Sequence, residues 1–168
     1  RIAVEALSGS TEIYQTYTAA RCTQALYDDF PEIDKITRIA KWDFEFEYQD
    51  KKFIEKKVFM VDSTFFDIFT FPVIKGQIST LLNEPNTAVV TESTAKRYFG
   101  NQDPINQIIT SDSTNYKVIA VVEDVPKNSH FHFDIALSLI SFDGFYNRTG
   151  WFANNFKQYI LLHKNVDY

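Results

Sequence analysis

The chain has 168 residues, 45% of them hydrophobic, which fits one globular unit or two small lobes and excludes the polar composition of a disordered protein. Its 22 acidic residues outnumber 17 basic ones, and the basic residues occur in short pairs, so the chain lacks the positive run expected of a nucleic-acid-binding protein. No apolar run of ~18 residues that could span a bilayer occurs, and the single cysteine, Cys22, cannot form an internal disulfide.

The N-terminal part is predicted to form a strand and then a helix. Residues 1–7 alternate in the manner of a strand, and the helical pattern that follows ends at Pro31. One face of this helix is apolar and is expected to lie on a sheet: it carries Ala19, Cys22, Ala25 and Leu26. Cys22 is therefore interpreted as a small buried hydrophobic residue.

A β-hairpin is predicted next. Every second residue of segment 36–48 faces the same way, namely Ile36, Arg38, Ala40, Trp42, Phe44, Phe46 and Tyr48. This period of two is typical of a half-buried antiparallel strand, and the polar sequence QDKK at 49–52 predicts the turn. Residues 53–61 form the second arm, but their alternation is less regular and leaves the register open.

The segment 58–77, VFMVDSTFFDIFTFPVIKGQ, is rich in phenylalanine and poor in charge. Asp62 or Ser63 is predicted to cap a short helix. Its rings, Phe65, Phe66 and Phe69, are expected to pack together between the hairpin and the helix. Pro72 cannot continue this helix, and Gly76 favours a sharp bend.

The remaining elements are marked by turn residues. A strand at 88–90, a cap at Thr91 and a helix that stops at Gly100 are predicted, the helix having Ala95, Tyr98 and Phe99 on one side. Two strands follow around the polar turn 111–115, and the apolar run Val118–Val122 indicates burial on both faces. Residues 131–142 fit a strand or a helix, 143–155 a loop or short helix, and 156–164 a strand.

Motifs for chemistry are weak. In an extended strand His130, His132 and Asp134 would share one face and could hold a metal, but the third histidine, His163, is far away in sequence. The chain has no Gly-x-Ser-x-Gly elbow and no glycine-rich phosphate loop, and adjacent carboxylates such as Glu123 and Asp124 are interpreted as solvated. We therefore assign no catalytic, cofactor-binding or metal-binding residue. A glycosylation sequon at 147–149 is discounted.

Several blocks of the sequence resemble a known family. They are FFDIFTFPVIKG (65–76), PNTAVVTESTAKRYFG (85–100) and VVEDVPKNSHFHFD (121–134), with LYDDFPEIDKITRI (26–39) and WFANNFKQYILLHK (151–164) in the same order and spacing. In this order they resemble the MacB-like periplasmic core domain of ABC-transporter permeases of the MacB/FtsX class. The resemblance covers nearly the whole chain.

The resemblance implies an α+β fold with mixed sheets and packed helices. It implies a porter-like strand-helix-strand lobe, similar to the porter lobes of drug-efflux pumps and here assigned to 1–86 and 152–168. A smaller inserted α/β lobe is assigned to 87–151. It further implies a non-enzymatic periplasmic domain without cofactor, anchored to the bacterial inner membrane by transmembrane helices of its own full-length chain, one before Arg1 and three after Tyr168.

In such a permease the domain transmits ATP-driven conformational change to a substrate or a partner protein. The implied partners are a separate cytoplasmic ABC ATPase, a periplasmic adaptor or substrate, and a second copy in a dimeric transporter. Two other hypotheses stay open. One is a metal-dependent hydrolase that uses His130, His132 and Asp134, which stoichiometric zinc would support, and the other is a free-standing domain that binds an apolar ligand.

Overall fold

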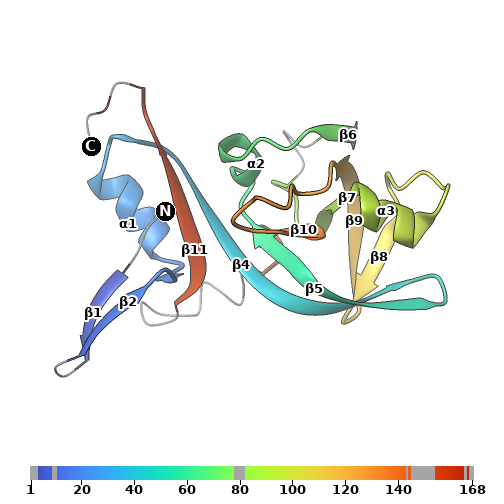
Figure 1. Cartoon of the computed structure of the whole chain (residues 1–168), viewed down its shortest axis with the longest axis horizontal. Coiled ribbons are helices and arrows are strands. Elements are labelled where there is room, and N and C mark those ends of the chain that lie inside the picture. Colours follow the sequence, from blue (N-terminus) through green and yellow to red (C-terminus); the bar gives the residue numbers. More distant parts are fainter. Residues whose placement is uncertain are drawn as a thin grey trace.

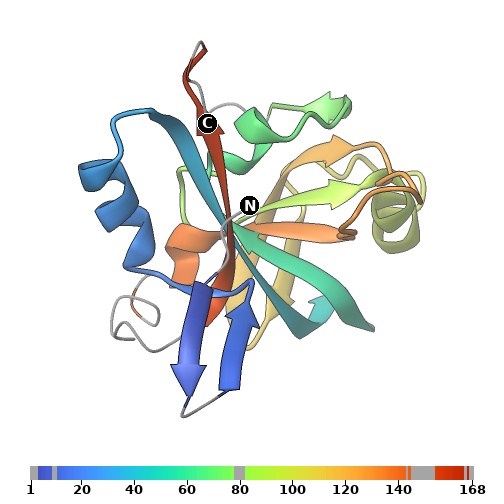
Figure 2. The ribbon, with the colours of Figure 1, turned by 60° about the vertical axis from the view of Figure 1, so that its left-hand side comes forward.

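The computed structural model describes residues 4–8, 11–77, 82–142, 144, 154–164 and 166, with the backbone alone for 4–8, 11–15 and 154. Strand β1 (Val4–Ser8) pairs antiparallel with β2 (Thr11–Gln15), and Figure 2 shows this hairpin extending away from the larger sheet. The predicted first strand is confirmed. The second arm, β2, was not predicted.

Helix α1 (Cys22–Asp29) follows the short strand β3 (Thr18–Ala19) and ends before Pro31 as predicted. It contacts β4 (Ile33–Tyr48), so it lies on a sheet, but none of its residues is buried. Cys22 is half-buried, and the interpretation of a buried cysteine was wrong. The expected apolar face of the helix is also shorter than predicted, because Ala19 belongs to β3.

The predicted hairpin is formed by β4 and β5 (Lys51–Val61), which are joined through Gln49 and Asp50. Their register contains a bulge: Trp42 pairs with Val58 and Phe44 pairs with Glu55, so β5 carries one extra residue there. Because of this extra residue, the alternation of inward and outward side chains in β5 changes phase at the bulge. In β4, which has no extra residue, the phase stays the same. The bulge is one cause of the irregular alternation of β5, whereas β4 alternates regularly from Phe44 to Tyr48.

The rest of the chain adds α2 (Phe65–Ile68), β6 (Val73–Gly76), β7 (Thr87–Thr91), α3 (Glu92–Phe99), β8 (Ile108–Ser111), β9 (Thr114–Val122), β10 (Ile135–Ser138), a 3-10 turn (Leu139–Phe142) and β11 (Asn154–Leu162). The predicted strands, the predicted helix that stops at Gly100 and the strand nature of β11 are confirmed. Segment 131–142, left open between strand and helix, contains β10 and the turn. The sequon at 147–149 lies outside the described residues.

One mixed sheet unites these strands in the order β3-β11-β4-β5-β10-β7-β9-β6, and β8 pairs with both β9 and β4. The pairing of β8 with β4, at Thr110 and Glu47, closes a ring of six strands: β4, β5, β10, β7, β9 and β8. Strands β10 and β5 are parallel, as are β7 and β9, so the fold is α+β with a mixed sheet. The single residue pair of Thr110 and Glu47 joins β8 to β4 and completes the ring.

The core has two parts. All six strands of the ring supply the inner cluster, which includes Phe46, Met60 and Val118 and which α3 extends with Tyr98 and Phe99. The outer cluster lies on the opposite face of the sheet under α2 and the segment 131–133. Strand β9 feeds both clusters, with Val118 and Val121 inside and Ile119, Ala120 and Val122 outside, which confirms the predicted burial on both faces.

The long strand β4 connects the two ends of the molecule. In Figure 1 α1 and the β1–β2 hairpin lie at the left end, and α3 and the turn between β4 and β5 lie at the right end. The ring combines β4 and β5, from the predicted first lobe (1–86 and 152–168), with β7 to β10, from the predicted inserted lobe (87–151). The division into two lobes stays a prediction.

Candidate functional site

A cluster of phenylalanine rings joins α2 to residues 131–133, which lie far from it along the chain. We name it the aromatic joint, and its members are Phe65, Phe66, Phe69, Phe71, Phe131 and Phe133. The ring of Phe65 is fully buried and lies at the centre of the aromatic joint. Its centroid lies 5.0 Å from that of Phe66 and 5.2 Å from that of Phe69. The predicted gathering of these three rings is confirmed.

The other half of the aromatic joint was not predicted. Phe131 and Phe133 each lie 5.9 Å from Phe65, measured between ring centroids, and come from the segment that leads into β10. Most of these pairs are tilted or edge-to-face, which is the arrangement that the ring quadrupoles favour. The rings of 65–71 therefore pack against Phe131 and Phe133 and not between the hairpin and the helix.

Polar contacts fix α2 on β4. The Arg38 guanidinium donates to both carboxylate oxygens of Asp62, at 2.9 and 2.7 Å, and the Arg38 backbone amide donates to the same carboxylate at 2.8 Å. Thr64, the N-cap residue, donates its hydroxyl to the carbonyl oxygen of Ile36. The predicted cap at Asp62 or Ser63 was wrong, because Asp62 is engaged by the paired donors of Arg38.

A surface ion pair adds to this attachment. Lys35 of β4 donates to Asp67 of α2 at 2.8 Å, and this hydrogen bond raises the pKa of Lys35. Both side chains are substantially exposed, so the contribution to stability is small. The bidentate pair between Arg38 and Asp62, with 18% of each side chain exposed, is the stronger anchor.

Segment 123–134 is held at both ends. At its start the Glu123 amide donates to the carbonyl of Pro72 at 3.0 Å, and at its end the Asp134 amide donates to the carbonyl of Lys57 at 2.8 Å. The side chain of Asp124 is exposed, as expected, yet it accepts a 3.0 Å hydrogen bond from the Ser93 amide in the first turn of α3. The segment thereby links β5, Pro72 just before β6, and α3.

The metal-dependent hydrolase hypothesis gains no geometric support. Residues 130–134 precede β10 and are not part of a strand, so the argument that alternate residues share a face does not apply. His130 makes a 3.0 Å hydrogen bond with the Tyr159 hydroxyl, while Asp134 uses its backbone to bond Lys57 and Thr91. Within the described ranges, no three His, Cys, Asp or Glu side chains gather in a way that could hold a metal.

A buried carboxylate lies at the other end of the hairpin. Glu55 is 3% exposed, and its oxygens accept from Arg97 at 2.6 and 3.1 Å and from the Tyr98 hydroxyl at 2.9 Å. Burial, reinforced by the nearby Glu55 charge, raises the pKa of Tyr98, and the hydrogen bond to Glu55 raises the pKa of Arg97. Each carboxylate oxygen has a donor, so this group ties α3 to β5.

A groove of ≈ 460 Å³ runs beside the aromatic joint. Its walls include Phe69, Phe71 and Phe131 together with Pro72 and Pro126. The lining also includes polar residues, among them Glu123 and Asp124, so the groove is only partly apolar. The hypothesis of an apolar-ligand-binding domain stays a prediction.

None of the helices in the described ranges is long and apolar enough to cross a membrane. A comparison with curated proteins finds no match. A domain of a permease protein from Porphyromonas gingivalis has a similar structure, with a TM-score of 0.80 and 19% sequence identity, over 94% of this chain and 68% of that one.

Two other solved structures share the fold. The periplasmic region of MacB from Actinobacillus actinomycetemcomitans matches with a TM-score of 0.70 and 14% identity, over 90% of this chain and 68% of that one. The extracellular domain of the noncanonic ABC-type transporter YknZ from Gram-positive bacteria matches with a TM-score of 0.66 and 11% identity, over 89% and 75% of the two chains. The sequence pattern of the MacB-like periplasmic core domain matches residues 3–166, so the chain belongs to this family and is an extracytoplasmic domain of an ABC-transporter permease.

Proposed function

We propose that this domain passes ATP-driven conformational change from the membrane part of its permease to a substrate or a partner protein, without catalysing a reaction itself. The family membership over residues 3–166 supports the setting. The observation that carries the proposal is the continuous sheet, in which the 16-residue strand β4 pairs with β11 near one end of the molecule and belongs to the closed ring at the other.

The dimensions of β4 suit this task. At about 3.3 Å per residue, a strand of this length has a contour of roughly 50 Å. It is hydrogen-bonded to β11 along its first half and to β5 from Ile39 to Tyr48, so a displacement of one end is carried by paired backbone and not by a free loop.

The aromatic joint supports transmission from the side of the sheet. Phe131 contacts Phe69 at 5.0 Å between ring centroids, and Phe69 contacts Tyr159 of β11 at 5.1 Å. Close-packed interiors have low compressibility and transmit strain. Movement of β11 relative to β4 would therefore press on α2 and on the segment before β10.

The proposal includes the assembly around the domain. Transmembrane helices of the same full-length chain anchor it to the bacterial inner membrane, a separate cytoplasmic ABC ATPase supplies the energy, and two copies form the transporter. A periplasmic adaptor or the substrate receives the movement.

The test uses the full permease with its ATPase in lipid nanodiscs, with Cys22→Ser and other cysteines removed. Spin labels are placed on Asp50→Cys, at the exposed turn between β4 and β5, or on Asp29→Cys, at the exposed end of α1. We expect ATP hydrolysis to change the distance between the two copies at both positions, and an ATPase-dead variant to show no change. If the Asp29→Cys label moves while the Asp50→Cys label does not, the domain absorbs the movement and the proposal fails.

A further inference from the structure

A second groove, of ≈ 580 Å³, lies on the face of the sheet beside the aromatic joint. We name it the basic groove. Its lining consists of Lys41, Lys57, Phe59, Lys127, His130, Phe131, His132 and Lys157. None of these described lining residues is acidic, although the chain as a whole has a net charge of -5.

The strand register places the charges around an aromatic floor. Lys41 of β4 is paired with Phe59 of β5, and Lys57 precedes Phe59 by two residues on the same face. Lys157 of β11 is paired with Ile39, two residues before Lys41. Three neighbouring strands therefore direct lysines to one side of the sheet, where the outer cluster ends at Phe59.

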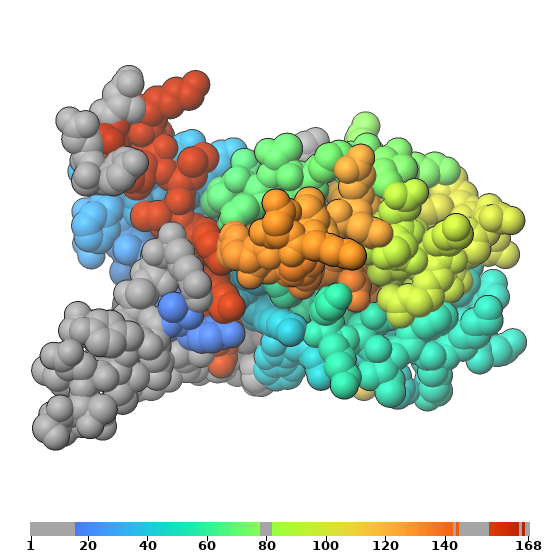
Figure 3. Space-filling model, in the orientation of Figure 1, coloured from blue at the N-terminus to red at the C-terminus, as the bar shows by residue number. Residues whose placement is uncertain are grey.

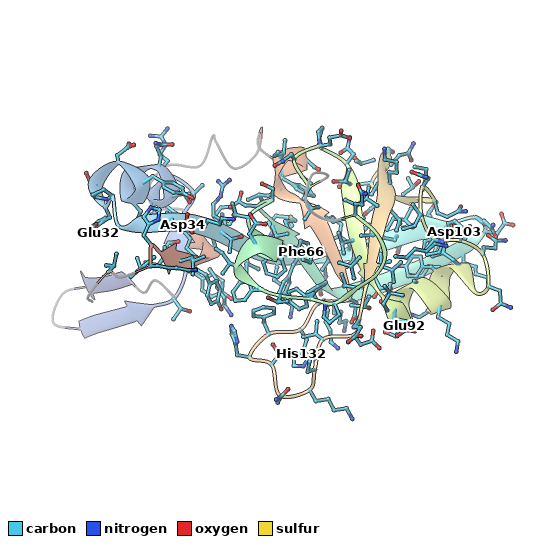
Figure 4. All side chains as sticks on the ribbon, turned by 90° about the horizontal axis from the view of Figure 1, so that it is seen from above. Glu32, Asp34, Phe66, Glu92, Asp103 and His132 are labelled. Atoms are coloured by element: carbon cyan, nitrogen blue, oxygen red, sulfur yellow. The ribbon has the colours of Figure 1, made fainter. Side chains whose placement is uncertain are left out.

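The loop that contains residues 127–132 forms the opposite wall. In Figure 3 this orange segment lies against the red β11 and above the light-blue to teal strands β4 and β5, and Figure 4 shows the loop at His132 projecting beyond the sheet. It adds Lys127 and Phe131, and the ring centroid of Phe131 lies 5.9 Å from that of Phe59. The two rings thus form a continuous apolar floor between the lysines.

The lysines are available for a ligand. Lys41, Lys57, Lys127 and Lys157 take part in none of the ion pairs found in the described part of the chain, whereas Lys35, Lys52 and Lys75 each pair with a carboxylate. Lysine ammonium groups are compact charges that bind phosphate and carboxylate groups without the fixed geometry of arginine. Four of them around one hollow attract an anion.

An apolar recess opens from the same place. This smaller hollow, ≈ 40 Å³, shares Lys41, Phe59, Phe131 and Lys157 with the basic groove and adds Tyr17, Ile39 and Tyr159. The ammonium of Lys157 lies 5.3 Å from the ring centroid of Tyr17, so this lysine stands at the boundary between the charged rim and the recess. Charge and apolar surface therefore meet within one site.

We propose that the basic groove binds an amphipathic anion. Its phosphate or carboxylate group is held by Lys41, Lys57, Lys127 and Lys157, and its apolar ring or chain lies on Phe59 and Phe131. This inference goes beyond the proposed function and does not depend on it, because binding is a property of the domain itself.

Calorimetric titration of the 168-residue chain with small aromatic probes tests the inference. We expect 1-naphthyl phosphate and 1-naphthoate to bind saturably, inorganic phosphate to bind at least about tenfold more weakly for lack of the apolar part, and 1-naphthylmethylamine not to bind. Saturable binding of only one of the two aromatic anions would also support the site. It would show whether the groove prefers a phosphate or a carboxylate group.

Two variants with equal loss of charge locate the site. Lys41→Gln/Lys57→Gln is expected to weaken binding of the aromatic anions by about tenfold, while Lys51→Gln/Lys96→Gln, at exposed lysines outside the groove, should leave Kd within about twofold. Thermal unfolding followed by circular dichroism checks that both variants fold. Equal weakening in both variants, equal affinity for the amine or for inorganic phosphate, or no saturable binding of either aromatic anion would overturn the inference.

Discussion

The two halves of the β4–β5 hairpin differ in how they bury their side chains. Beyond the bulge, from Phe44 to Tyr48, β4 alternates between buried or half-buried and exposed residues, because only the face toward the inner cluster is covered. Before the bulge, consecutive residues such as Ile39 and Ala40 are both buried, one in the outer and one in the inner cluster. In β5 the four residues Val58–Val61 are all buried.

The comparison shows what a strand pattern reports. Regular alternation indicates that one face of a strand is covered, and its loss indicates either a second covering layer or an extra residue in the strand. Both causes act in β5. The bulge turns Glu55 toward the inner cluster and Ile54 toward solvent, where 71% of Ile54 is exposed.

The largest expected effect lies in the outer cluster, which covers the second face of the hairpin before the bulge. Phe65→Ala removes the fully buried centre of the aromatic joint and should lower the free energy of unfolding by about 3–5 kcal/mol, measured by urea denaturation. As a control, Phe30→Ala removes a ring that is 51% exposed and should cost less than about 1.5 kcal/mol. Equal losses of unfolding free energy in the two variants would show that the centre of the outer cluster stabilises the fold no more than an exposed ring does.

The half of the hairpin beyond the bulge, which only the inner cluster covers, is tested at its buried carboxylate, Glu55. Glu55→Ala leaves Arg97 and the Tyr98 hydroxyl without their acceptor and should cost about 2–3 kcal/mol, less than a fully buried pair because the Arg97 side chain is 43% exposed. Glu47→Ala, which removes one of the two exposed partners of Lys52, should leave the urea midpoint nearly unchanged. The urea midpoints of the two variants measure these losses. A Glu55→Ala variant as stable as the parent chain would contradict the role of Glu55 in tying α3 to β5.

Two glycines with positive φ, Gly76 and Gly100, differ in how much space an added side chain would have. At Gly76, with φ +85°, an added Cβ would lie 2.2 Å from the Ile119 carbonyl oxygen, so Gly76→Ala should cost about 2 kcal/mol or more and loosen the pairing of β6 with β9. At Gly100, with φ +62°, an added Cβ meets nothing within 4 Å, so Gly100→Ala should cost only about 1 kcal/mol. Amide exchange of β6 provides the readout, and the reverse order of the two losses would contradict the argument.

The smallest effect is confined to alkaline pH. Burial raises the pKa of Tyr98 above its value in the unfolded chain, roughly 10, so the neutral phenol is favoured in the folded state. The stability that this shift contributes is fully present below pH ~10 and is lost as the pH rises further. Unfolding at pH 8 and pH 11 should show a smaller alkaline loss for Tyr98→Phe than for the parent chain. Equal losses would contradict the assignment, and Tyr116, whose pKa burial also raises, is a control that stays in both proteins.

Local patterns predicted most of the elements. The β4–β5 hairpin, the helix that stops at Gly100, the strands around 111–115 and β11 are all readable from short stretches, because turn residues and alternation are local signals. The cap at Asp62 or Ser63 was predicted wrongly because the Asp62 carboxylate binds Arg38 instead. Arg38 lies on β4, far from Asp62 in the sequence. Cys22 was placed in the core because a helical pattern does not report how much of the helix is covered.

The candidate sites were predicted only in part. Sequence proximity brought Phe65, Phe66 and Phe69 together, but Phe131 and Phe133 joined them through a packing contact that no local pattern reports. The basic groove had no signal, since its lysines come from β4, β5, β11 and a loop and form no run in the chain. His130 and His132 line this groove, and among the residues that the structure describes no third ligand joins them to form the metal site that their spacing suggested.

By itself the sequence determined the α+β composition, the family resemblance and the positions along the chain of most strands and of the helix that stops at Gly100, because these depend on residue type and on spacing within a few residues. Only the tertiary structure decided the closure of the six-strand ring, the bulge that turns Glu55 inward and the meeting of four lysines over Phe59 and Phe131. These features depend on strand register between distant segments. A shift of one residue would reverse every side chain on a strand without changing its local pattern.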